Sequence, residues 1–182
     1  MSKIITLAQN VISYIEPDIE AIEIHDIATG LAHCNRYSGQ TRNAYSVLQH
    51  TLTVFDLAPK ELKGHALFHD AAEAYTGDIP GPLKKMIPEL KVVDKKLSIA
   101  IYKRFGIKPS PRLKFFDNVA MYLEVKAMGN IDHPYWASFV SAMRQYDMTQ
   151  YETLNHDLHM NYTEMHLIGK FMSLTKKYRG DL

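Results

Sequence analysis

Apolar and polar side chains recur at helical spacing over residues 59–75, and a turn rich in glycine and proline follows at residues 77–82. One face of a helix over residues 59–75 carries Leu62, Ala66, His69, Asp70 and Glu73. A second stripe on the same helix consists of Leu67, Ala71, Ala74 and Tyr75. Because both stripes need to be covered, the pattern predicts a central helix. Three ionisable groups on a buried face are costly unless they are paired, hydrogen-bonded or bound to an ion, which first indicates a metal site.

Helical patterns also flank this segment on both sides. They predict helices over residues 24–34, 46–57, 88–105, 111–128 and 155–178. Ser46 is a candidate N-cap for the second of these helices. Pro88 fits the first position of the third helix, and Gly106 is expected to end it. These start and stop signals agree with the periodicity, so the predicted boundaries rest on two kinds of evidence.

The remaining segments give weaker signals. Residues 4–15 fit either a helix or a strand, because their apolar run shows no decisive period. Residues 35–43 are typical of a loop, and residues 130–150 of irregular structure rich in aromatic side chains. Since no clear run of alternating strands occurs anywhere, we expect an all-α fold, a helical bundle around a buried metal site.

Length, charge and cysteine content narrow the function classes. The chain has 182 residues, of which 46% are hydrophobic, so we expect a single domain with one substantial core. A net charge of +1 favours neither nucleic acid nor an anionic membrane as a partner. The single cysteine, Cys34, rules out an internal disulfide and suggests the cytoplasm. No signal peptide is visible, because Glu16, Asp18 and Glu20 interrupt the first apolar run, and no run approaches the roughly 20 residues that span a bilayer.

Four potential metal ligands fall on core-facing stripes of three different predicted helices. These ligands are His50, His69, Asp70 and Asp117. Two imidazoles and two carboxylates can bind one divalent ion and leave coordination positions open for water and a phosphate oxygen. Such a mixed set suits Co²⁺, Mn²⁺, Zn²⁺, Fe²⁺ or Mg²⁺, and the residue types do not select one of them.

The motif around these ligands resembles that of the HD-domain metal-dependent phosphohydrolases. It consists of His69-Asp70, a carboxylate one turn later at Glu73, and then the segment Thr-Gly-Asp-Ile-Pro-Gly-Pro-Leu-Lys at residues 76–84. Within that family the chain is similar to the small 5′-deoxynucleotidases of the YfbR type and to the DatZ-type dATP triphosphohydrolases of phages. The sequence around His50 resembles the first histidine of the family, and Asp117 resembles its distal aspartate. The resemblance covers about residues 24–128 and leaves residues 129–182 as a C-terminal helical extension.

The resemblance also implies roles for residues around the metal. Glu73 is the candidate that orients a water molecule or transfers a proton, and Asp78 corresponds to an aspartate at the nucleotide site. Lys84 could neutralise phosphate. Arg36 corresponds to an arginine that contacts phosphate or sugar. Tyr37 stands where related proteins have Trp or Phe, and in those proteins the ring crowds the ribose 2′ position.

Other polar residues have simpler explanations available. Arg42 is a second basic candidate for substrate binding in the loop that carries Arg36, and a solvated arginine is its alternative. His65 lies one turn before His69 and is expected to pack on a helix face rather than to act as a fifth ligand. His156 and His159 have a spacing that could hold a metal, but we expect a solvated helix start there.

The resemblance implies a hydrolase of 2′-deoxynucleoside 5′-phosphates, which acts either as a monophosphatase or as a triphosphohydrolase. Basic residues near the site mildly favour room for a polyphosphate; they are Arg42, Lys84, Lys85 and Lys114. A small-molecule nucleotide is the expected partner, and the apparent relatives imply a homo-oligomer, a dimer or a hexamer. Two alternatives stay open: a non-catalytic HD module that binds nucleotide as a sensor or scaffold, and a helical protein with a structural metal.

Overall fold

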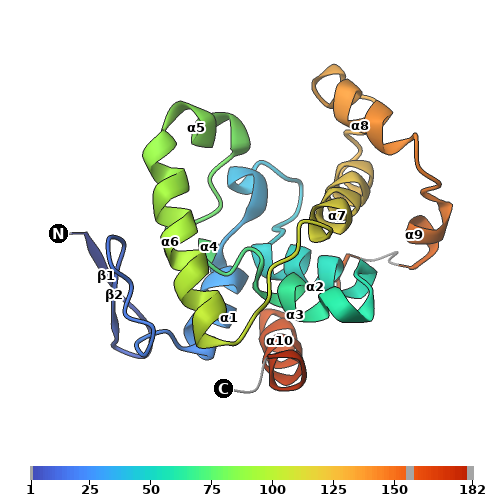
Figure 1. Cartoon of the computed structure of the whole chain (residues 1–182). Coiled ribbons are helices and arrows are strands. Elements are labelled where there is room, and N and C mark those ends of the chain that lie inside the picture. The colour runs from blue at the N-terminus through green and yellow to red at the C-terminus, as the bar shows by residue number, and fades with distance from the viewer. Residues whose placement is uncertain (1, 155–157, 180–182) are drawn as a thin grey trace.

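The computed structural model describes residues 2–154 and 158–179, and helices dominate it (Figure 1). The helices are α1 (Ile24–His33), α2 (Val47–Leu57), α3 (Lys63–Phe68), α4 (Glu73–Thr76), α5 (Gly81–Met86), α6 (Pro88–Arg104), α7 (Leu113–Ala127), α8 (Ala137–Met143), α9 (Thr149–Leu154) and α10 (Glu164–Tyr178). Short 3₁₀ turns lie at Arg36–Gly39, Lys60–Leu62 and Pro134–Trp136. The prediction of a mostly helical fold is therefore confirmed. None of the helices in these described ranges combines the length and the hydrophobicity needed to cross a bilayer.

The N-terminal segment is a β-hairpin, so the strand alternative for residues 4–15 is correct. Strand β1 (Lys3–Ile5) pairs antiparallel with β2 (Val11–Ser13), with Ile4 opposite Ile12. The connecting turn closes through a hydrogen bond from Gln9 N–H to Thr6 O at 3.0 Å, and Gln9 has φ +63°. Ile12 is fully buried, whereas its neighbour Val11 is exposed. A fold of helices alone is thus too narrow a description.

Local start and stop signals are confirmed where the sequence carries them. Ser46 caps α2: its hydroxyl accepts from Gln49 N–H, and the Gln49 side chain accepts from Ser46 N–H at 2.7 Å. Pro88 occupies the first position of α6. Gly106 and Gly129 follow α6 and α7 with φ of +63° and +73°, a conformation that favours glycine. The sequence therefore determines these helix ends locally.

The predicted continuous helix over residues 59–75 is wrong. A 3₁₀ turn leads into α3, and a tight turn at residues 69–72 separates α3 from α4. Backbone bonds in this turn connect residues three apart, as in Glu73 N–H to Asp70 O at 2.9 Å and Ala71 N–H to Phe68 O at 3.1 Å. Periodicity alone does not distinguish such a turn from a continuing α-helix.

The predicted helix over residues 155–178 also starts too early. Helix α10 begins at Glu164, with Thr163 as its N-cap. Leu158 and His159 precede it with φ of +47° and +59°, which a helix does not allow. Residues 155–157 lie outside the described residues.

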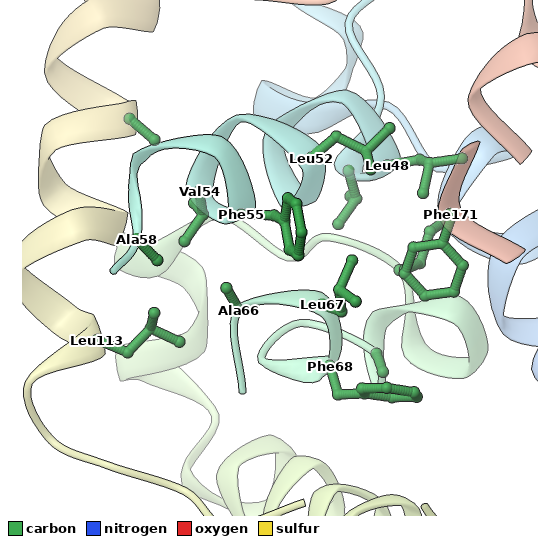
Figure 2. Close-up of a cluster of buried hydrophobic side chains, with 14 of the residues drawn as sticks. Leu48, Leu52, Val54, Phe55, Ala58, Ala66, Leu67, Phe68, Leu113 and Phe171 are labelled. Carbon is green, nitrogen blue, oxygen red and sulfur yellow. The ribbon is translucent and has the colours of Figure 1, made fainter. Parts of the chain in front are cut away.

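The hydrophobic core lies between α2 and α3, and α10 closes one side of it (Figure 2). Leu48, Leu52 and Phe55 from α2 face Ala66, Leu67 and Phe68 from α3, and Phe171 from α10 packs beside them (Figure 2). The ring of Phe68 stacks on Phe105 with centroids 4.9 Å apart. Because α2 and the end of α3 both border this core, their polar residues are positioned by rigid, tightly packed neighbours.

Candidate metal centre

Two histidine side chains meet where α2 and α3 approach each other. Nε2 of the fully buried His50 lies 3.4 Å from Nε2 of His69. Nδ1 of His50 lies 2.6 Å from a carboxylate oxygen of Glu124, and Nδ1 of His69 lies 2.8 Å from the carbonyl oxygen of Ala66. Both of these oxygens accept hydrogen bonds, so each Nδ1 donates. In the neutral imidazoles the two Nε2 lone pairs then face each other, and only a shared cation or proton can satisfy them together.

Two carboxylates flank this pair of nitrogens. Asp117 Oδ1 lies 3.2 Å from His50 Nε2, and Asp70 Oδ2 lies 3.5 Å and 3.2 Å from the Nε2 atoms of His50 and His69. The ligand atoms of His50, His69 and Asp117 all lie within 4.8 Å of one another. A cation about 2.1 Å from each ligand places neighbouring ligand atoms about 3.0 Å apart in an octahedron and about 3.4 Å apart in a tetrahedron. His50, His69 and Asp117 are therefore close enough to share one divalent cation, and Asp70 Oδ2 lies within 3.5 Å of both imidazole nitrogens.

The pKa values of these groups report strong mutual attraction between the imidazoles and the carboxylates. Burial and the Arg36 guanidinium lower the pKa of His50, but Glu124 and Asp117 outweigh them and raise it to about 9. Burial raises the pKa of Asp70, but His69 and His50 reverse this effect and hold it below its usual range. In the same way, His50 and His69 outweigh burial and hold the pKa of Asp117 well below its usual range. The carboxylates thus stay ionised and favour a cation between the imidazoles.

Glu124 organises the site, and the sequence analysis assigned it no role. Its side chain is fully buried, and four side chains donate hydrogen bonds to it. Oε1 accepts from His50 Nδ1 and from the Tyr45 hydroxyl, while Oε2 accepts from Arg36 and from the Tyr37 hydroxyl. A carboxylate on the far nitrogen of a metal-binding histidine fixes its tautomer and raises its basicity. The available signal was the spacing from Asp117, because two helical turns along α7 place both residues on one face.

Arg36 and Tyr37 join this network from the loop before α2. Arg36 Nε and Nη2 lie 3.2 Å from Glu124 Oε2, and Arg36 Nη1 lies 4.0 Å from Asp70 Oδ2. Tyr37 has φ +55°, a rare conformation for an aromatic residue that costs roughly 1–3 kcal/mol. Its hydroxyl donates to Glu124 at 2.6 Å and its N–H to Asp78 Oδ2 at 3.3 Å. The structure therefore brings Arg36, Tyr37 and Asp78 to the edge of the centre.

Glu73 and Lys84 are in direct contact. Lys84 Nζ lies 3.0 Å from Glu73 Oε1 and 3.2 Å from Asp94 Oδ2, so it contacts both side chains. Glu73 Oε2 is buried and has no hydrogen-bond partner among the described residues. Burial, Asp70 and Asp78 raise the pKa of Glu73 to about 8 against the opposing effect of Lys84. Glu73 is therefore protonated at neutral pH and can donate a proton.

Three other predicted residues lie apart from the ligands. Arg42 is exposed and lines a surface hollow with residues 128–130, and nothing in the described structure connects it to the ligands. His65 accepts a hydrogen bond from Ser110 N–H at 3.1 Å and packs edge-on against Tyr102, so its packing role is confirmed. The predicted solvated helix start at His159 is wrong, because this residue is buried and contacts Asp56 at 2.9 Å. His156 lies outside the described residues.

Similarity to other known proteins extends over much of the chain. No protein-family model matches it. The chain is 35% identical over 138 residues to the uncharacterized protein YfdR of Escherichia coli (strain K12), which covers 75% of this chain and 78% of that protein. The chain belongs to the YfdR family. It is also 38% identical over 128 residues to the uncharacterized protein RCAP_rcc00048 of Rhodobacter capsulatus, across 62% of this chain and 65% of that protein. Membership of the YfdR family assigns no activity by itself, so function has to be argued from the site.

Proposed function

We propose that this protein is an HD-type, metal-dependent phosphohydrolase that cleaves the 5′-phosphate ester of 2′-deoxynucleoside 5′-phosphates. One observation carries the proposal: the Nε2 atoms of His50 and His69 face each other at 3.4 Å, between the carboxylates of Asp70 and Asp117. The spacing of His69-Asp70, Glu73 and Asp78 along the chain supports the same class of enzyme by its resemblance to that family.

His50, His69, Asp70 and Asp117 would hold the cation. When bound, a divalent ion lowers the pKa of a coordinated water molecule and neutralises charge on phosphoryl oxygens. The chain supplies the proton transfer. The raised pKa of Glu73, about 8, and its one oxygen without a hydrogen-bond partner among the described residues suit a general acid for the departing 5′ oxygen.

The edge of the site would bind the nucleotide. Arg36 provides a guanidinium that is 4.0 Å from Asp70 and is oriented by Glu124, a suitable position for contacting a phosphate oxygen. Tyr37 lies beside it and is fixed at both its hydroxyl and its N–H. A rigid aromatic ring at this position would crowd a ribose 2′ hydroxyl. Asp78 holds the Tyr37 backbone and thereby positions the ring.

Monophosphates are the first substrates to test. The basic residues that favoured a triphosphate are mostly engaged: Lys84 pairs with Glu73 and Asp94, and Lys114 pairs with Asp117 at 2.8 Å. Arg42 lies at a separate surface hollow. These pairings leave little positive charge for a long polyphosphate tail.

The test is a product assay on the full chain. Metal-stripped protein is reloaded with Mn²⁺, Co²⁺, Zn²⁺, Fe²⁺ or Mg²⁺ and incubated with deoxynucleoside and ribonucleoside mono- and triphosphates, and products are identified by mass. We expect a nucleoside and inorganic phosphate from deoxynucleoside monophosphates, and no product from the Asp70→Ala variant. Nucleotide binding without turnover by the metal-loaded protein would instead favour the sensor or scaffold. Unfolding of Asp70→Ala would favour a structural metal.

A further inference from the structure

A second hollow lies between the N-terminal hairpin and helices α1 and α4, and it shares no residue with the candidate metal centre. Its volume is about 230 Å³. Hairpin residues 4–7 form one wall, with the apolar side chains of Ile4, Ile5 and Leu7. Helices α1 and α4 form the rest, and the hairpin stands at the edge of the molecule (Figure 1). Apolar cavities of about 150 Å³ already admit benzene, so this hollow can take a ring-sized ligand.

Three buried polar atoms on the residues that line this hollow have no hydrogen-bond partner in the part of the chain that the structure describes. They are Asp26 Oδ2, Thr29 Oγ1 and Tyr75 Oη. Asp26 and Tyr75 are both only 6% exposed. Buried polar groups in folded proteins are nearly always satisfied, so three exceptions around one hollow need an explanation.

Asp26 is the decisive residue of the three. Its Oδ1 accepts from Ala8 N–H at 2.9 Å, but no lysine, arginine or histidine among the described residues forms an ion pair with it. Negative charge also acts on the neighbouring hydroxyl: burial, then Asp26 and Glu23, raise the pKa of Tyr75. A buried carboxylate without a cation favours a positively charged group and repels an anion.

The hollow is built on a rigid base. Gly30 of α1 packs directly against α4, and a Cβ at this position would lie 2.8 Å from both Cβ and O of Ala74. The two helices therefore cannot approach further to fill the space. Direct contact also links the hairpin to α1 through the bond between Ala8 and Asp26. A preformed, mostly apolar cavity with a few polar groups is typical of a small-molecule site.

We propose that this hollow binds a small molecule that carries a protonated amine on a compact apolar body. The ammonium group would lie at the Asp26 side of the hollow, next to a carboxylate that forms no ion pair among the described residues. The apolar body would pack against Ile4 and Leu7 of the hairpin. This site is independent of the proposed hydrolase activity.

Benzylamine, which is protonated at neutral pH, tests the proposal against its neutral analogue benzyl alcohol. Binding to the full chain is measured by isothermal titration calorimetry and by saturation-transfer NMR. We expect benzylamine to bind, and Asp26→Asn to weaken it at least about tenfold because the negative charge that attracts the ammonium group is lost. Asp132→Asn is the matched control, since that carboxylate is 91% exposed at the side chain, and it should leave affinity unchanged. Benzyl alcohol should bind wild type and Asp26→Asn equally.

Amide chemical shifts provide a second measurement that does not depend on the stability of a variant. Benzylamine should shift the amide signals of Thr29, Gly30 and Ala74 and leave that of His50 unchanged. Two results overturn the proposal: no binding of benzylamine to the wild-type chain, or equal binding to wild type and Asp26→Asn. In the first case ordered water would be the occupant of the hollow.

Discussion

Two buried carboxylates, Glu124 and Asp26, differ in how their oxygens are used. Glu124 is fully buried, and both of its oxygens accept hydrogen bonds, from four side chains in all. Asp26 is 6% exposed, accepts one backbone hydrogen bond and keeps one buried oxygen without a partner in the part of the chain that the structure describes. Glu124 can therefore accept no further hydrogen bond from a ligand, and it acts by positioning the residues around it. Asp26 can still accept a hydrogen bond.

This difference separates a residue that positions other side chains from a residue that can bind a ligand. A satisfied buried network fixes its members in one geometry, because each member would lose a partner if it moved. A buried carboxylate oxygen without a partner contributes little to the stability of the folded chain until a hydrogen-bond donor binds to it. The following predictions test this distinction, beginning with the metal centre, where the losses should be largest.

His69→Ala should abolish both metal binding and hydrolysis. The variant removes one of the two opposed Nε2 atoms, and we expect turnover to fall by on the order of 10³ or more. Its stability should change little beyond the loss of packing, because the other polar contacts of the ring among the described residues are the Ala66 carbonyl and the partly exposed Asp70 carboxylate. Metal content after dialysis and product formation measure the first effect, and thermal unfolding measures the second. Full metal occupancy in this variant would contradict the ligand assignment.

Glu124→Gln should weaken metal binding without removing any ligand. The amide NH₂ faces a donor on at least one side, so the variant leaves part of the contacts with His50 or Arg36 unsatisfied. We expect metal affinity to fall about 10- to 100-fold, which is typical of a residue that orients a metal ligand. The free energy of unfolding should fall by about 2–4 kcal/mol.

Tyr45→Phe is the matched control for that variant. It removes one of the four donors, at 3.2 Å, and leaves the other three in place. We expect a loss of about 1 kcal/mol and little change in metal affinity. If both variants behaved alike, Glu124 would be a packing residue without a positioning role.

The rate of hydrolysis should depend on the protonation of Glu73. Its pKa of about 8 means that it donates a proton below that pH and loses this ability as the pH rises through it. Because Lys84 lowers this pKa, Lys84→Met should raise it further and move the alkaline fall in kcat to higher pH. Lys85→Met is the control, since Lys85 is exposed. A pH profile of kcat at constant ionic strength measures the shift, and an unchanged alkaline limb in Lys84→Met would contradict the assigned role.

The sequence predicted the parts of the site that depend on local pattern. His50 and Asp117 were identified because they interrupt apolar stripes, and the cap at Ser46 because a serine stands directly before an apolar helical run. Glu124 was missed because its partners lie between 74 and 88 positions away along the chain. Hydrogen bonds over such separations leave no periodic signal.

Local backbone geometry explains most of the errors in the fold. The turn at residues 69–72 keeps a helical spacing of apolar residues while its backbone bonds shorten to three residues, which side-chain pattern does not reveal. The hairpin at residues 3–13 depends on a turn with positive φ at Gln9, a residue with only weak preference for it. Arg42 was selected for its proximity to Arg36 in sequence, but the loop directs it to another surface.

Asp26→Asn has the smallest expected effect and compares the two buried carboxylates most directly. The substitution is the same carboxylate-to-amide change as Glu124→Gln, in a residue that is also buried. Asparagine keeps an oxygen for Ala8 N–H, and its NH₂ replaces an oxygen that has no hydrogen-bond partner among the described residues. No contact is therefore lost, and the position near the start of α1 favours a negative charge by only about 0.3–1 kcal/mol. Chemical denaturation should therefore show a free energy of unfolding that is unchanged or up to about 1 kcal/mol lower. A loss as large as that expected for Glu124→Gln would mean that the Asp26 charge already has a partner within the fold, and the distinction between the two carboxylates would disappear.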